Sequence, residues 1–201
     1  MEERSFGVED GRVRVGGNEP LRRRRLVVLL RALLFVPHYI VLSVWSMLVL
    51  AVLPISWLAA LLIGRVPQRL HRFLAAFLRY SGQAMAWLEL LSGRYPDPLH
   101  TREHPFSIEI PEPRRQHRLV TLLRVPLALP ALVLTSVFSV ILTTVAFGSW
   151  FVALVLGRTT AGLQELGTFC LRYQLETQAY VALLTSRYPR LVPAVEPQTP
   201  Q

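Results

Sequence analysis

The sequence predicts an all-α integral membrane protein built from two tandem repeats, and three observations support this fold class. Two apolar runs, Leu26 to Ile63 and Leu119 to Leu156, are each 38 residues long. Each run is followed by a segment with one polar and one apolar helical face. The chain also matches itself without gaps at an offset of 93 residues.

The composition excludes several classes of protein. With 52% hydrophobic and 17% charged residues and a mean hydropathy of +0.37, the chain is too apolar to be disordered. A single cysteine, Cys170, excludes a disulfide framework and a cysteine-based zinc site. All 22 basic residues are arginine, and 13 acidic residues leave a formal charge of +9.

The apolar runs are long enough to cross a bilayer, because a transmembrane helix needs about 20 apolar residues. Only Arg31 and His38 interrupt the first run, and only Arg124 interrupts the second. The polar, mixed-charge residues before the first run are unlike a cleavable signal peptide. We therefore expect both runs to remain in the protein and to place it in a membrane.

The path of each run through the bilayer has two solutions. A straight 38-residue helix is about 57 Å long, whereas the hydrocarbon core measures about 30 Å. Either 26–43 and 47–64 form a hairpin, or 26–36 lies in the interface, 38–63 spans alone and 69–91 recrosses. The hairpin is favoured because both arginine-rich starts then face the cytoplasm and the amphipathic helices stay in the interface.

The repeat is supported by motifs in register. Trp57 matches Trp150, Gly64-Arg65 matches Gly157-Arg158, and Arg94-Tyr95-Pro96 matches Arg187-Tyr188-Pro189. Alternating residues at 12–15 and 106–110 predict a short strand before each repeat. The expected units are a polar tail (1–11), the first repeat (12–98), a linker (99–104), the second repeat (105–191) and a Pro-rich tail (192–201).

These motifs resemble a bacterial membrane-protein family known only as domain of unknown function 4389, in two tandem copies. The resemblance rests on the Arg-x5-Arg start, Pro37-His38, the Trp-x6-Gly-Arg stretch from Trp57, Leu-Arg-Tyr and the final Arg-Tyr-Pro, and it covers about 170 residues. The second copy departs from it, with Ala131 after Pro130 and Thr159-Thr160 after Gly157-Arg158. The resemblance supports the architecture and implies no activity.

Arginines near the ends of the apolar runs are the candidate contacts for lipid headgroups or a partner, although they also set the topology. They are Arg22, Arg23, Arg24, Arg25, Arg65, Arg69, Arg72, Arg114, Arg115, Arg118 and Arg158.

Four further arginines are candidate intramembrane charges: Arg31, Arg79, Arg124 and Arg172. Arg31 and Arg124 lie near the start of their runs, so we expect their side chains to snorkel to the interface. Arg79 and Arg172 would enter the bilayer only if the second helices cross it, with Glu89 and Glu176 as partners.

The sequence predicts no catalytic site, no cofactor and no metal. His100 to His104 match an H-x-x-E-H pattern, but Pro98 and Pro105 flank them and favour a solvated linker over a metalloprotease helix. Nucleic-acid binding is not expected, because the charge flanks apolar runs and no recognition motif accompanies it.

We therefore expect a non-enzymatic, multi-pass protein of the bacterial cytoplasmic membrane, with its N-terminus in the cytoplasm. Its partners would be anionic membrane lipids, with a protein partner or a second copy of the chain as an alternative. A different hypothesis is a small transporter or channel component with a path between the repeats. Its path would need a cluster of hydroxyl side chains: Ser43, Ser46, Thr135, Ser136, Ser139, Thr143 and Thr144.

Overall fold

The computed structural model describes residues 14–16, 25–93, 95–96, 107–111 and 118–191. Four helices and two short strands follow one another in the order β1 (Arg14–Gly16), α1 (Arg25–Ile63), α2 (Gln68–Leu88), β2 (Ser107–Glu109), α3 (Arg118–Leu156) and α4 (Ala161–Val181). Both ends of α3 lie 93 residues after the ends of α1, and the same shift relates α4 to α2. The two halves therefore have the same helical plan.

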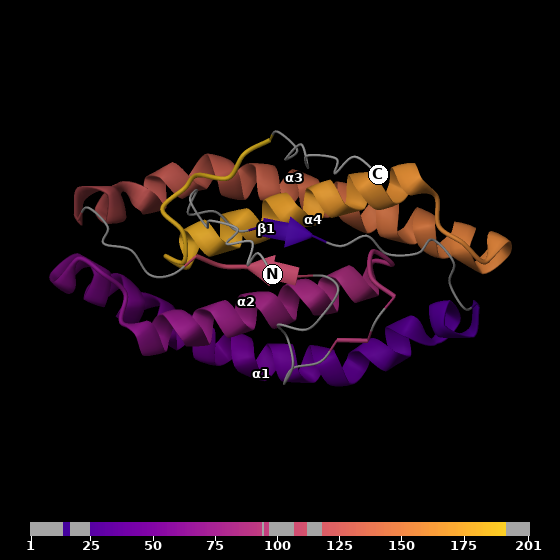
Figure 1. Cartoon of the computed structure of the whole chain (residues 1–201), viewed down its shortest axis with the longest axis horizontal. Helices are drawn as coiled ribbons and strands as arrows, with labels where there is room; N and C mark the ends of the chain where they lie inside the picture. Colours follow the sequence, from indigo (N-terminus) through magenta and orange to yellow (C-terminus); the bar gives the residue numbers. More distant parts are fainter. Residues whose placement is uncertain (1–13, 17–24, 94, 97–106, 112–117, 192–201) are drawn as a thin grey trace, which may run out of the picture.

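Each apolar run forms one continuous helix of 39 residues, so the predicted hairpin is wrong. The segment around Ser43 and Ser46 contains no glycine, asparagine or proline to start a turn. Their hydroxyls donate instead to carbonyls of α1 itself, at Tyr39 (2.7 Å) and Ser43 (2.8 Å). Pro37 and Pro54 lie inside α1, and both long helices are bowed in Figure 1.

One stripe of each long helix is buried, with the period of about 3.5 residues that lets a helix pack along a neighbour. In α1 the stripe comprises Val28, Arg31, Phe35, His38, Leu42, Ser56 and Ala60. In α3 it comprises Thr121, Arg124, Ala128, Ala131, Leu142, Val145, Ser149 and Ala153. Six of the seven α1 positions recur in α3 after the shift of 93, so the repeat extends to packing.

Each long helix ends at a glycine that reverses the chain. Gly64 (φ 75°) and Gly157 (φ 71°) adopt the left-handed conformation, which glycine enters without a Cβ clash. Their amides donate to the carbonyls of Ala60 and Ala153, at 2.9 Å in both cases. The second helix of each half then runs back antiparallel along the first.

The second helices lie between the two long ones (Figure 1). Leu74 and Leu78 of α2 share one core with Leu171 and Leu175 of α4 and with Leu142 of α3. The halves also meet at both ends of the molecule, so α1 and α3 run antiparallel. At one end the indole of Trp150 donates to the Val28 carbonyl (2.9 Å), and at the other Trp57 donates to the Val181 carbonyl (3.3 Å).

The alternating segments before each repeat form the two strands, which pair antiparallel with Arg14 opposite Glu109. Ile108 of β2 is buried in the core shared by α2 and α4. The Ile108 carbonyl accepts a hydrogen bond from Nε of Arg79 at 3.1 Å. Figure 1 places the strands near the middle of the long axis.

Two residues after the end of each second helix, a leucine adopts the left-handed conformation. These leucines are Leu90 (φ 64°) and Leu183 (φ 62°). A residue with a Cβ is disfavoured there by about 1–2 kcal/mol. Both leucine side chains are buried, and each packs on the opposite half. Leu90 contacts the cluster of Trp150 and Ala153, and Leu183 contacts that of Trp57 and Ala60.

Candidate membrane-contacting surface

The outward surfaces of α1 and α3 are apolar along their whole length, and we call them the apolar belt. Except for five residues, every exposed large hydrophobic residue in the described part of the chain lies on these two helices. The exposed side chains run from Leu29 to Ile63 on α1 and from Leu122 to Leu156 on α3. The five exceptions are Met85, Tyr95, Leu166, Tyr188 and Leu191.

The belt is unlike the surface of a soluble helix bundle. By length and composition, 28–63 and 121–156 are candidate membrane spans, whereas an equally long and apolar core helix of a soluble protein would be mostly buried. Only 11% of the apolar stretch in 28–63 and 18% of that in 121–156 are buried. A contiguous apolar surface of this extent marks a contact with lipid or with another protein.

The exposed serine and threonine side chains on the belt have hydrogen-bond partners within their own helices. The only charged residues in 28–63 and 121–156 are Arg31 and Arg124, and both are buried. The exposed hydroxyls of Ser136, Thr143 and Thr144 donate to carbonyls four residues earlier, at 2.9–3.0 Å. A surface whose hydroxyls are satisfied internally suits hydrocarbon, where water is absent.

The hydroxyl cluster that a transport path would need does not converge. Four members, Ser46, Ser136, Thr143 and Thr144, are exposed and Ser43 is half-buried, and the hydroxyls of all five donate within their own helix. Ser139 donates to the carbonyl of Thr135 in the same way, at 2.9 Å. The arrangement therefore gives the transport hypothesis no support.

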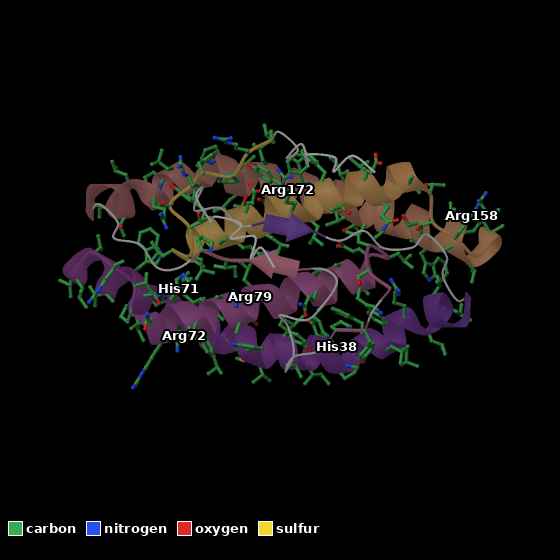
Figure 2. The ribbon with its side chains drawn as sticks, viewed as in Figure 1. His38, His71, Arg72, Arg79, Arg158 and Arg172 are labelled. Atoms are coloured by element: carbon green, nitrogen blue, oxygen red, sulfur yellow. The ribbon has the colours of Figure 1, made fainter. Side chains whose placement is uncertain are left out.

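Four of the candidate arginines lie at or near the two turns between helices. Arg65, Arg69 and Arg72 are exposed at the α1–α2 turn, and Arg158 is exposed at the α3–α4 turn. Figure 2 shows Arg72 and Arg158 toward opposite ends of the molecule. Each end of the apolar belt thus adjoins exposed positive charge.

The remaining candidates at the helix starts are less fully described. Arg25 and Arg118 are the first residues of α1 and α3. The others lie outside the described residues: Arg22, Arg23, Arg24, Arg114 and Arg115. The H-x-x-E-H motif of 100–104 also lies outside them.

Arg31 and Arg124 are buried, so the expectation that they snorkel to the interface is wrong. Their exposed fractions are 3% and 0%. Each guanidinium faces the end of the second helix of its own half. Arg124 donates to the Tyr180 carbonyl at 3.0 Å, with its guanidinium carbon 4.5 Å from the centre of that ring.

The first half repeats this arrangement. Arg31 donates to the carbonyls of Trp87 and Ser92 and lies 4.6 Å from the centre of the Trp87 ring. Trp87 and Tyr180 are equivalent at the offset of 93. A helix C-terminus has unpaired carbonyls and partial negative charge, so a cation there is favourable. The two arginines therefore cap α2 and α4.

Arg79 and Arg172 lie at the middle of α2 and α4, and Figure 2 labels both. Arg79 donates to β2, as described above. Arg172 forms an ion pair with Glu176 at 3.1 Å, which is the partner that the sequence suggested. Arg79 thus bonds to β2, and Arg172 bonds within α4.

The first half contains an aromatic cluster around His38. Its Nδ1 lies 2.6 Å from the Tyr80 hydroxyl, and its ring centre lies 4.5 Å from that of Tyr95. Trp87 and Phe35 complete the cluster, with ring centres 6.4 Å from that of His38. Ala131 stands at the equivalent place in the second half and is buried there, so this cluster belongs to one repeat only.

Glu89 was not singled out as a site of its own by the sequence. Its carboxylate is largely buried, and Oε2 has no hydrogen-bond partner among the described residues. Burial raises the pKa of Glu89 to about 8. The thiol of Cys170 is buried and free, and burial together with the charge of Glu89 raises its pKa.

The chain belongs to a family of unknown function. The family model described as "Domain of unknown function (DUF4389)" matches residues 25–100 and again residues 118–191. The two matches cover most of the chain and coincide with the two structural halves. Comparison with curated proteins and with solved structures gave no match.

Proposed function

We propose that this protein is a non-enzymatic component of the bacterial cytoplasmic membrane that embeds through α1 and α3 and gathers anionic lipid. The observation that carries the proposal is the apolar belt. It covers the full length of two 39-residue helices and contains no exposed charge between 28 and 63 or between 121 and 156.

Positive charge at both ends of the belt supports the choice of anionic lipid. Arg65, Arg69, Arg72 and Arg158 are exposed next to apolar surface, where headgroup phosphates would lie. Each arginine near an anionic surface contributes about 1 kcal/mol, which is a factor of about five in partitioning. Arginine also fits phosphate with two parallel hydrogen bonds.

The test has a membrane arm and a lipid arm. Washing isolated membranes with alkaline carbonate should leave the protein in the membrane fraction, because the belt is immersed in hydrocarbon. Release into the wash would overturn the proposal. Membrane patches excised around the protein with an amphipathic polymer should be enriched in anionic lipid relative to the bulk membrane.

Matched variants separate charge from other effects. Replacing Arg65, Arg69, Arg72 and Arg158 together by glutamine should reduce the enrichment at least fivefold. Replacing the same four by lysine should retain most of it, because the charge is kept. Equal lipid ratios in the wild type and in the glutamine variant would refute the role of these arginines.

A further inference from the structure

We infer that the protein lies flat, with all four helix axes in the membrane plane and the apolar belt in the acyl chains of one leaflet, so that it acts as a wedge that curves the membrane. This inference rests on the proposed function and adds the orientation and the kind of partner, which is a single lipid leaflet. It departs from the multi-pass arrangement expected from the sequence.

The length of the apolar belt is the first argument. A helix of 39 residues is about 58 Å long, nearly twice the roughly 30 Å of hydrocarbon. The exposed apolar side chains continue to both ends, with Leu29 at 53% exposure and Ile63 at 61%. An upright molecule would hold much of this surface in water, whereas a flat one places the whole length of the belt at one depth in the membrane.

The position of the strands is the second argument. Ile108 of β2 packs in the core between α2 and α4, near the middle of the long axis (Figure 1). In an upright molecule this two-stranded sheet would stand at the bilayer centre, where open sheet edges do not occur next to lipid. Laying the helices flat allows the strands to face water.

The polar residues of the second helices agree with this orientation. Arg79 and the Arg172–Glu176 ion pair lie at mid-length of α2 and α4. Upright, these charges would share the bilayer centre with the strands. In the flat orientation they lie on the strand side, near the headgroups, and the arginines at the two turns reach the same level.

A flat molecule of this kind occupies one leaflet only. A helix with its side chains is about 10–12 Å across, which fits within the roughly 15 Å of half the hydrocarbon core. Insertion therefore expands one leaflet and not the other. An inserted apolar body of this geometry responds to curvature and, at sufficient density, produces it.

Depth measurements distinguish the two orientations. In the full chain carrying Cys170→Ser, a spin label is attached to single cysteines at Leu33→Cys, Ile40→Cys or Met47→Cys. These positions are seven residues apart, lie on one line of α1, and are 57–74% exposed. Their depths in vesicles of zwitterionic and anionic phospholipid are then measured by collisions with oxygen and with a nickel chelate.

The flat orientation predicts that the three labels lie at the same depth to within a few ångströms, less than about 15 Å below the phosphates. An upright molecule would separate Leu33 from Met47 by about 21 Å and overturn the inference. Labels exposed to the nickel chelate at all three positions would instead refute membrane embedding, and with it the proposed function.

A second readout tests the wedge. Mean vesicle diameter should fall as the ratio of protein to lipid rises. A constant diameter at equal label depths would overturn the curvature step while leaving the proposed function in place. A label at Arg72→Cys, on the exposed part of α2, serves as the reference and should be accessible to the nickel chelate.

Discussion

Replacing Arg124 by methionine removes the guanidinium that caps α4 and keeps most of the side-chain volume. The hydrogen bond to the Tyr180 carbonyl (3.0 Å) is charged and contributes about 1.5–3 kcal/mol. The contact with the Tyr180 ring adds up to about 2 kcal/mol in a desolvated setting. The charge at the helix C-terminus adds up to about 2 kcal/mol more.

The cost of burying the charge opposes these contributions. Nε and Nη2 of Arg124 have no hydrogen-bond partner among the described residues, so desolvation is only partly offset. Methionine removes that cost together with the three contributions, and the Tyr180 carbonyl keeps the backbone amide of Leu183 as a donor at 3.2 Å. We expect Arg124→Met to lower the free energy of unfolding by about 2–4 kcal/mol.

The assay is unfolding of the purified protein in mild detergent, titrated with a denaturing detergent and followed by near-ultraviolet circular dichroism. Arg31→Met should give a similar loss, because Arg31 caps α2 in the same way. Arg124→Lys should give an intermediate loss, since an ammonium donates to the carbonyl but cannot stack as a plane. The exposed Arg72→Met is the control and should change stability by less than about 0.5 kcal/mol. A loss for Arg124→Met no larger than this control would refute the capping argument.

Three further predictions concern the ends of α2 and its neighbourhood. Leu90→Ala should lower the free energy of unfolding by about 2–4 kcal/mol in the same assay. Leu90→Gly should lower it less, because glycine relieves the left-handed strain of about 1–2 kcal/mol. A larger loss for Leu90→Gly than for Leu90→Ala would contradict this role of backbone strain. The pKa of Glu89 is raised to about 8, so the unfolded chain loses this proton first, and stability should fall as the pH rises from about 4.5 to 8. Glu89→Gln should make the free energy of unfolding less dependent on pH in this range. The same pH dependence in the wild type and in the variant would contradict the assignment to Glu89. Cys170, buried and with a raised pKa, should resist a maleimide until the protein is unfolded, whereas rapid labelling of the native protein would place the thiol at the surface.

The repeat, the order of the helices and the short strands are predictable from the sequence because they depend on local spacing. Residues in register at an offset of 93 reappear as helix ends in register, such as Gly64 and Gly157. The alternating residues at 12–15 and 106–110 mark where β1 and β2 form, although each strand is shorter than its segment.

The two wrong predictions, the hairpin and the snorkelling arginines, share one physical cause. A local sequence pattern carries no information about which distant residues a segment packs against in the fold. The hairpin followed from the assumption that each run crosses the bilayer, yet nothing in 43–46 breaks a helix. Arg31 and Arg124 were expected to snorkel because they lie near the start of their apolar runs. The carbonyls that they bind, those of Trp87 and Tyr180, lie 56 residues further along the chain. The left-handed leucines give no sequence signal, because leucine has no preference for that conformation.

The exchange of leucines between the halves bears on how the duplicated chain arose. Leu90 of the first half completes a cluster with Trp150 and Ala153 of the second, and Leu183 of the second completes the cluster of Trp57 and Ala60. A chain with a single repeat would expose both the leucine and the tryptophan, because the residue that each one packs against lies in the other half. Two such chains satisfy each other across a twofold axis. Fusing them in tandem makes that dimer permanent and frees each half to diverge, as His38 and Ala131 have done.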